Sequence, residues 1–189
     1  MSSPPNRFGA IILAAGSSSR IGYPKQTLVF RGEALLDRAI RIAQESGAQE
    51  TVVVLGANAA EIRNACRLRN CTVVDNDRWA SGMGTSIRQG IASLRDVAGT
   101  LILTCDMPAV TSAHLQALSA SGTLVASRYS GKCGVPAYFP HAEFAALSQL
   151  EDSQGASRLL HAAPSIELHG GDFDVDTPED VFRLNQFAV

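Results

Sequence analysis

Two cationic side chains, Arg20 and Lys25, lie in a loop of small and hydroxyl-bearing residues near the start of the sequence. The apolar run before them, 8–14, predicts a strand that is buried on both faces. In such a loop, backbone N–H groups approach a phosphate closely, while the guanidinium and ammonium groups neutralise its charge. We therefore expect the loop to hold a triphosphate, whose departing pyrophosphate gains negative charge during transfer. The residues expected to bind the nucleotide here are Leu13, Ala14, Ala15, Gly16, Ser17, Arg20 and Lys25.

The loop matches neither of two common phosphate-binding motifs. It has no Gly-Lys-Ser/Thr step into a helix, and Ser18 stands at the second glycine position of G-x-G-x-x-G. A dinucleotide-binding oxidoreductase is disfavoured, because an acid at the distance expected for ribose binding is also missing. The remaining alternative is a surface loop in which Arg20 and Lys25 are merely solvated.

Acidic residues supply a candidate metal site. Asp106 follows the apolar run 101–104, where a carboxylate is costly unless it is exposed or bound to a cation. Mg²⁺ prefers carboxylate oxygens and commonly uses one or two of them together with phosphates, so Asp106 is a candidate metal ligand and catalytic residue. Its alternative role is to cap the next turn. Asp174 and Asp176 share one face of an extended segment, and of these two we favour Asp176 as the second ligand.

Strand-like and helix-like segments alternate along the chain. Expected strands are 8–14, 51–55, 71–74 and 101–104, and an antiparallel pair at 124–126 and 135–139 flanks the polar turn 130–134. Expected helices are 33–46 closed by Gly47, 58–66 capped by Asn58, 82–94, one capped by Thr111 or Ser112, 142–150, 155–162 and one capped by Thr177. This order predicts an α/β fold, a single Rossmann-like three-layer domain with a mainly parallel sheet, one antiparallel pair and helices on both faces.

Ligands of such sheets bind beyond the carboxyl ends of the strands. This rule adds Gly56, which follows the second strand, and the segment 75–86, which follows the third. Glycines there permit close backbone approach to a ligand, and hydroxyls can bind the ligand or cap the next helix. The expected nucleotide contacts in these loops are Gly56, Asn76, Gly84 and Ser86.

Composition narrows the class of protein. The chain has 189 residues, of which 46% are hydrophobic and 18% charged, and its formal net charge is −2. We expect a single domain over 1–189, with residues 1–7 outside the ordered fold. No basic run predicts nucleic-acid binding, and no apolar run reaches the ~20 residues of a membrane span. Four cysteines without a paired spacing or a signal peptide predict a reducing cytoplasm.

The loop sequence resembles that of the MobA-like nucleotidyltransferases, most closely the molybdenum cofactor cytidylyltransferase branch. The similar segments are Leu13–Gly16, Ser19-Arg20, Gly22, Lys25-Gln26, Cys105–Pro108 and Asp174–Asp180, with Ile21 where the family usually has Met. The resemblance implies a Mg²⁺-dependent transfer of CMP from CTP to the phosphate of molybdopterin, with Asp106 as a metal ligand and 75–86 around the base and ribose. Alanine at position 15, rather than glycine, is typical of members that use CTP instead of GTP. The same resemblance implies delivery of the product to a molybdoenzyme apoprotein.

The acceptor side departs from the family pattern. Val135 replaces a histidine, and Asp152 and Arg158 are each displaced by one residue around Gly155-Ala156. Other acceptors therefore stay open: a sugar phosphate, a polyol phosphate or phosphocholine, with GTP as the alternative nucleotide. A cofactor carrier without catalysis stays open too. No histidine falls in the expected loops, which suits a phosphate acceptor, because its monoester is largely ionised near neutral pH (second pKa ~6).

Overall fold

The computed structural model describes residues 7–186. Its main feature is one seven-stranded sheet in the order β5-β4-β1-β6-β8-β7-β9. These strands are β1 Phe8–Ala14, β4 Glu50–Leu55, β5 Thr72–Asp75, β6 Gly99–Thr104, β7 Val125–Tyr129, β8 Lys132–Pro140 and β9 Ser165–Glu167. The pairs β5–β4, β4–β1, β1–β6 and β7–β9 are parallel, whereas β8 runs antiparallel to β6 and β7. The predicted α/β class and the predicted antiparallel pair, β7–β8, are confirmed.

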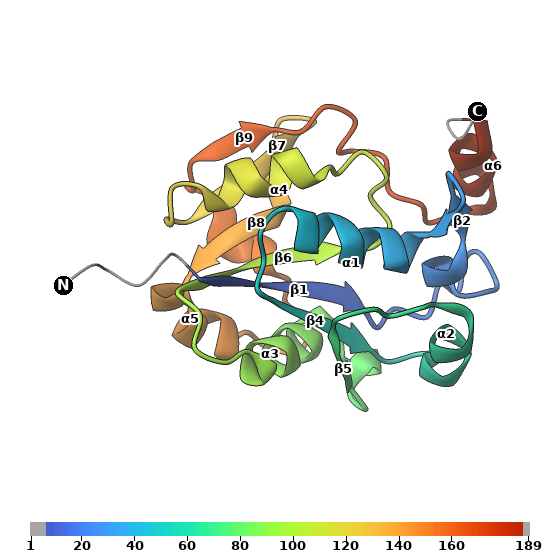
Figure 1. Cartoon of the computed structure of the whole chain (residues 1–189), viewed down its shortest axis with the longest axis horizontal. Helices are drawn as coiled ribbons and strands as arrows, with labels where there is room; N and C mark the ends of the chain where they lie inside the picture. Colours follow the sequence, from blue (N-terminus) through green and yellow to red (C-terminus); the bar gives the residue numbers. More distant parts are fainter. Residues whose placement is uncertain (1–6, 187–189) are drawn as a thin grey trace.

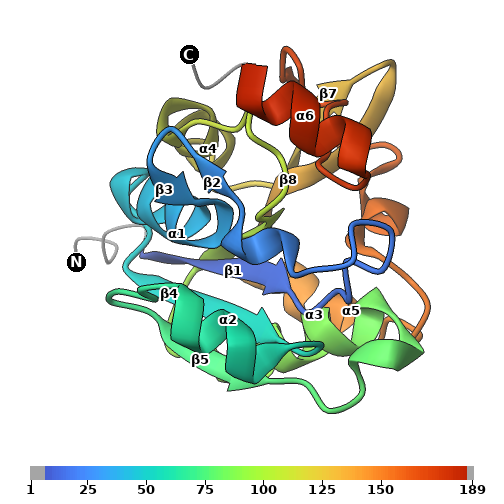
Figure 2. The ribbon, with the colours of Figure 1, turned by 90° about the vertical axis from the view of Figure 1, so that its right-hand side faces the viewer.

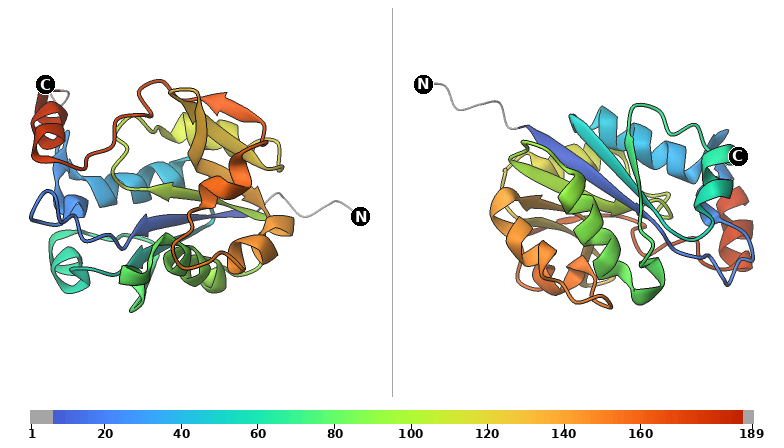
Figure 3. Two further views of the ribbon diagram at one scale, coloured as in Figure 1. Left: turned by 180° about the vertical axis from the view of Figure 1, so that it is seen from behind. Right: turned by 90° about the horizontal axis from the view of Figure 1, so that it is seen from below.

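Helices cover both faces of this sheet, which gives three layers (Figure 1). The α-helices are α1 Leu35–Glu45, α2 Ala59–Ala65, α3 Met83–Ser93, α4 Ser112–Ser119, α5 Phe144–Ser148 and α6 Pro178–Gln186. Short 3₁₀ helices are η1 Lys25–Thr27, η2 Trp79–Ser81, η3 His141–Glu143 and η4 Ala156–Leu160. Helices α1 and α4 lie on one face, and α3 and α5 lie on the other, as the views from behind and below also show (Figure 3). A separate small hairpin joins β2 Val29–Phe30 to β3 Glu33–Ala34.

The central strand explains the two apolar layers. All seven residues of β1 are buried, and neighbouring side chains of a strand point to opposite faces. Ala10 and Ile12 join the cluster beneath α1 and α4, whereas Ile11 and Leu13 join the cluster beneath α3 and α5. The continuous apolar run of the sequence therefore corresponds to a strand buried from both sides, as predicted.

Several helix ends follow the sequence prediction. Gly47, at a φ of 99°, ends α1, and the hydroxyl of Thr111 accepts a hydrogen bond from His114 N at 3.2 Å. Thr177 and Asp180 cap α6 reciprocally: Asp180 N donates to Thr177 Oγ1 at 3.3 Å, and Thr177 N donates to Asp180 Oδ2 at 3.0 Å. Asn58 is the N-cap residue of α2, as predicted, but it does not cap the helix through its side chain. Its backbone is left-handed, at a φ of 57°, and its side chain makes no cap hydrogen bond.

Other differences concern short elements. The predicted helix 155–162 is the 3₁₀ helix η4, and 142–150 divides into η3 and α5. The turn expected over 130–134 is only Ser130-Gly131, because both residues adopt a positive φ and β8 already begins at Lys132. Strand β9 and the β2–β3 hairpin were not predicted, since two- and three-residue strands carry little periodicity.

The first residues and the helix lengths test two further expectations. Arg7 belongs to the fold, because its guanidinium contacts Glu50 at 3.1 Å and its carbonyl accepts from Ala98 N at 2.7 Å. Residues 1–6, the rest of the segment expected outside the fold, lie outside the described residues. Within residues 7–186, no helix is both long and apolar enough to cross a membrane.

The start of α3 yields a stability prediction. A Cβ added at Gly84 would lie 2.0 Å from the backbone oxygen of Glu151, so Gly84→Ala forces two backbone segments apart. We expect a loss of roughly 1–3 kcal/mol, as in other overpacked sites, measured as a lower midpoint in urea. Gly16→Ala is the matched control, because a Cβ at Gly16 meets nothing within 4 Å. Equal midpoints for the two variants would contradict this packing role.

Candidate active site

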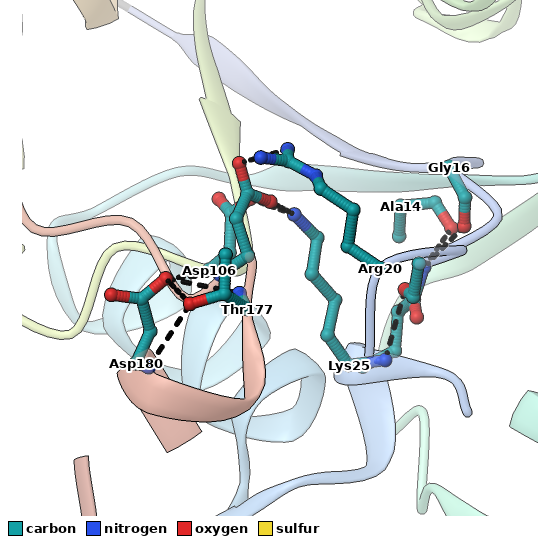
Figure 4. Close-up of polar contacts among 10 residues, drawn as sticks. Ala14, Gly16, Arg20, Lys25, Asp106, Thr177 and Asp180 are labelled. Atoms are coloured by element: carbon teal, nitrogen blue, oxygen red, sulfur yellow. Dashed lines mark hydrogen bonds and ion pairs between the residues drawn. The ribbon is translucent and has the colours of Figure 1, made fainter. Parts of the chain in front are cut away.

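The ammonium group of Lys25 joins two carboxylates at the carboxyl edge of the sheet (Figure 4). Lys25 Nζ donates to Asp106 Oδ2 and, at 2.6 Å, to Asp176 Oδ1. The guanidinium of Arg20 contacts the other oxygen of Asp176 at 2.7 Å. Three segments far apart in sequence, the first loop, the end of β6 and the segment before α6, therefore meet at one cluster of charge. Four of the expected catalytic and metal-binding residues lie together here.

The C-terminal segment reaches this cluster because it is anchored on both sides. Val175 N donates to the carbonyl of Asp106 at 3.0 Å, which sets the segment beside the end of β6. The side chain of Val175 is fully buried in a small apolar cluster with Ile21, Phe30, Leu35 and Leu184. Figure 2 shows α6 standing above the loops at this edge of the sheet. The apolar contacts thus place Asp176 opposite Lys25.

The first loop is held from below by Gln26, which the sequence analysis left without a role. Gln26 is 1% exposed, and its Nε2 donates to the carbonyls of Ala14 at 2.8 Å and Gly16 at 3.3 Å. Within the loop, the hydroxyl of Ser18 accepts from Lys25 N at 3.1 Å, while the backbone of Ser18 adopts a positive φ of 53°. These contacts fix the path of the loop. The type of residue at position 26 gave no sequence signal beyond its place beside Lys25.

Charge and burial oppose each other at the cluster. Burial alone would lower the pKa of Lys25, but Asp106 and Asp176 hold it above its usual value. Partial burial acts to raise the pKa of Asp176, yet Lys25 and Arg20 together bring it below its usual value. At Asp174, partial burial and the nearby Asp106 and Asp176 outweigh the attraction of Lys25 and raise the pKa to about 6. The acids therefore repel one another wherever a cation does not intervene.

A cavity of about 230 Å³ opens beside this cluster. The expected nucleotide-binding residues that line it are Leu13, Ala14, Ala15, Gly16, Lys25 and Ser86, and Asp106 lies in the same wall. Six further lining residues were not among the expected nucleotide contacts. They are Gln26, Trp79, Gly82, Met83, Thr104 and Cys105. Trp79, which was expected either to stack on a ligand or simply to pack, does pack closely: a Cβ added at Gly56 would lie 2.5 Å from the Trp79 Cβ.

Five of the expected nucleotide-binding residues lie outside the cavity lining. Asn76 is buried and donates to the hydroxyls of Thr85 and Ser86 at 2.8 and 2.9 Å, so it orders the loop before α3. Gly56 provides space for Trp79, and Gly84 approaches the backbone of residue 151 rather than open space. Ser17 and Arg20 are exposed at the rim. The structure therefore gives Asn76, Gly56 and Gly84 packing roles.

One buried oxygen favours a cation at this site. Asp106 is 8% exposed, and its Oδ1 is a buried acceptor without a hydrogen-bond partner among the described residues. An unpaired carboxylate oxygen beside a second carboxylate fits a divalent ion with oxygen ligands. Over residues 7–186, no group of three or more His, Cys, Asp and Glu side chains could hold a metal without other ligands. The donor set therefore fits Mg²⁺ that shares its coordination with phosphate and water.

The ion pairs yield a pH-dependent stability prediction. We expect Lys25→Met to lower the free energy of unfolding by about 1–3 kcal/mol at pH 7 in EDTA, because it leaves two carboxylates without their cation. The side chain of Asp176 is 34% exposed, which keeps this loss below that of a fully buried pair. Because the pKa of Asp176 is lowered, its ion pair stabilises the fold at pH values above 3.8, its ordinary pKa. Because the pKa of Lys25 is raised, its ion pairs stabilise the fold at pH values below 10.5. The loss should therefore shrink below pH ~4.

The control removes an ion pair on the surface. Arg41 contacts Glu33 and Glu45 at 2.9 and 3.0 Å, but its side chain is 46% exposed. Arg41→Met is expected to cost under ~1 kcal/mol in the same urea titrations. Similar losses in both variants, or a Lys25→Met penalty that persists unchanged at low pH, would show that the Lys25 pairs contribute no more than surface ones.

Known proteins similar to this chain share its architecture. Residues 10–167 match the MobA-like NTP transferase domain. The chain is 33% identical over 129 residues to nicotine blue oxidoreductase of Paenarthrobacter nicotinovorans, a segment that spans 68% of this chain and 60% of that protein. It is 28% identical over 197 residues to purine catabolism protein PucB of Bacillus subtilis, which covers 90% of this chain and 92% of that protein.

Solved structures extend the similarity to the whole fold. Rv0371c of Mycobacterium tuberculosis superposes with a TM-score of 0.84 at 28% identity, over 95% of this chain and 98% of that chain. A manganese complex of Rv0371c superposes with a TM-score of 0.77 at 25% identity, over the same shares. The family match covers well over half of the sequence and includes Lys25 and Asp106. This chain therefore belongs to the MobA-like NTP transferase domain family.

Proposed function

We propose that this protein is a Mg²⁺-dependent cytidylyltransferase that transfers CMP from CTP to the phosphate of molybdopterin and releases pyrophosphate. The observation that carries the proposal is the cluster of Lys25, Asp106 and Asp176 beside the cavity lined by the first loop. Cations beside a loop of small residues suit a triphosphate, and paired carboxylates suit the metal that accompanies it. The family and the manganese complex of a similar protein support metal-dependent transfer.

Each group has a defined task in this reaction. An oxygen of the acceptor phosphate forms a bond to the α-phosphorus of CTP, and the bond from that phosphorus to the bridging oxygen of pyrophosphate breaks. The backbone around Gly16 and the side chains of Arg20 and Lys25 stabilise the charge that builds on pyrophosphate. Asp106 and Asp176 would hold Mg²⁺, which supplies charge neutralisation and orients phosphate oxygens. The acceptor needs no protein base, because its phosphate is already ionised.

Lys25 has two sets of partners in this account. Its side chain neutralises Asp106 and Asp176 in the structure. When the acids hold a metal ion, the flexible lysine stem lets the ammonium turn to phosphate oxygens instead. Lys25 thus neutralises the two acids in one arrangement and phosphate oxygens in the other. Delivery of the product to a molybdoenzyme apoprotein is the corresponding downstream step.

A prediction follows for activity. Asp106→Asn keeps the shape of the side chain but removes its charge, so pyrophosphate release with Mg²⁺ should fall to background. Asp96→Asn is the control, since Asp96 is an exposed acid at the opposite edge of the sheet, before β6. Arg20→Ala should slow transfer by about 10²-fold, the usual cost of losing one transition-state donor. Near-normal rates in Asp106→Asn would remove Asp106 from the metal site.

The choice of base yields a second prediction. Ala15 is 7% exposed, lines the cavity and packs beside Gly56, so its methyl group narrows the space for a base. Overpacking by a purine costs ~1–3 kcal/mol, which corresponds to a preference for CTP over GTP of roughly 5- to 150-fold. CTP should therefore give the higher kcat/KM, and Ala15→Gly should narrow the difference. The measurement is competition between equal CTP and GTP, with mass spectrometry of the product. A guanylylated product dominating in the unsubstituted protein would exclude the cytidine assignment.

Two alternatives to nucleotidyl transfer are distinguished by whether pyrophosphate is released. A cofactor carrier without catalysis would bind molybdopterin but release no pyrophosphate with any nucleoside triphosphate. An oxidoreductase remains a candidate because one relative is named nicotine blue oxidoreductase. Oxidation of NADH or NADPH by the purified protein with nicotine blue as the electron acceptor, without pyrophosphate release, would favour that activity.

A further inference from the structure

A second cavity, of about 670 Å³, lies between the β7–β8 hairpin and η4. Three of its lining residues are permanent cations: Arg128 on β7, Lys132 at the start of β8 and Arg158 on η4. His161 adds a further basic group. Among the described residues, its lining includes no acidic side chain and no Phe, Tyr or Trp. The cavity has the size of a typical small-molecule site and a strongly positive wall.

No carboxylate of residues 7–186 forms an ion pair with these cations. In the part of the chain that the structure describes, the ion pairs within 4.0 Å include none of Arg128, Lys132 and Arg158. Arg128 Nε donates only to the hydroxyl of Ser165, at 3.0 Å. By contrast, Arg78 and Arg88 both contact Asp152. All three cations are exposed at the cavity, where a bound anion would be attracted to each of them.

The topology places this cavity at the same edge of the sheet as the nucleotide cavity. Strand β8 is antiparallel to β6 and pairs Ala137 with Ile102, so residues 132–134 extend past the end of β6, beyond which Asp106 lies. Met83 and Gly155 connect the two cavities. Met83 lines the first cavity, Gly155 lines the second, and a Cβ added at Gly155 would lie 3.3 Å from Met83 Sδ. A ligand in one cavity therefore neighbours a ligand in the other.

We infer that the second cavity binds the acceptor, and that this acceptor carries a negatively charged group in addition to its reacting phosphate. The inference rests on the proposed transfer and narrows its acceptor class. Arg128, Lys132 and Arg158 recognise the additional anionic group by charge-assisted hydrogen bonds. A quaternary ammonium group would be repelled by these cations, and no Phe, Tyr or Trp ring lies among the described lining residues to hold it. Phosphocholine, and polyol phosphates without a second anionic group, are thus expected to be poor acceptors.

Direct binding tests this assignment without turnover. Fructose bisphosphate is titrated calorimetrically into the full chain saturated with Mg²⁺ and α,β-methylene CTP, which keeps the nucleotide cavity filled and blocks transfer. Phosphocholine is the comparison probe, with one phosphate and one quaternary ammonium group. We expect the bisphosphate to bind at least tenfold more tightly than phosphocholine.

Variants locate the binding in the second cavity. The double variant Arg128→Ala/Arg158→Ala should weaken binding of the bisphosphate at least tenfold while leaving the affinity for the CTP analogue unchanged, because it removes two charge-assisted hydrogen-bond donors to the anion. The control Arg69→Ala/Arg95→Ala removes two exposed cations that line neither of these two cavities. It should bind both probes as the unsubstituted protein does.

Three results would overturn the assignment: no binding of the bisphosphate, equal affinity for the two probes, or equal losses in the two double variants. Failure of the proposed transfer is recognised separately. If no nucleoside triphosphate yields pyrophosphate but the bisphosphate still depends on Arg128 and Arg158, the anion site stands and the cytidylyltransferase assignment falls. If transfer proceeds and the double variant keeps its KM for the acceptor, the site falls instead.

Discussion

The pairing of one ammonium group with two carboxylates determines the arrangement of this site. Lys25, Asp106 and Asp176 come from three separate parts of the chain, and each would be costly to bury alone. The burial of Val175 in its apolar cluster and its hydrogen bond to the Asp106 carbonyl bring the last of these parts into place. The fold thus supplies, through apolar packing, the free energy that holds like charges close together beside a cavity.

That edge of the sheet combines two electrostatic environments. Acidic side chains gather around Lys25, where in the proposed reaction a metal ion and a triphosphate would compensate each other's charge. The neighbouring cavity is lined by cations alone among its described charged residues. A reaction between two phosphates needs both, because the reactants repel each other in solution. The narrow contact between Met83 and Gly155 keeps the two environments distinct yet adjacent.

The sequence predicted the sheet and placed Lys25, Asp106 and Asp176 at its carboxyl edge, because buried strands and the residues after them follow simple periodic rules. It assigned Lys25 to phosphate and did not predict its ion pairs with both acids. It did not predict the role of Gln26, whose two hydrogen bonds depend on the tertiary path of the loop. Gly84 also differed from expectation: glycine indicates close approach, but not what approaches, and here it is the backbone of residue 151. Residues such as Thr104 line the cavity through strand register alone.

The fate of isotopically labelled phosphate tests the central claim most directly. The protein is incubated with Mg²⁺, molybdopterin and CTP labelled either at the α- or at the γ-phosphate, and the acceptor and the released phosphates are separated by chromatography. We predict that the α-label moves to the acceptor and that the γ-label leaves only in pyrophosphate. A γ-label on the acceptor, or release of inorganic phosphate without labelled acceptor, would contradict nucleotidyl transfer at this site.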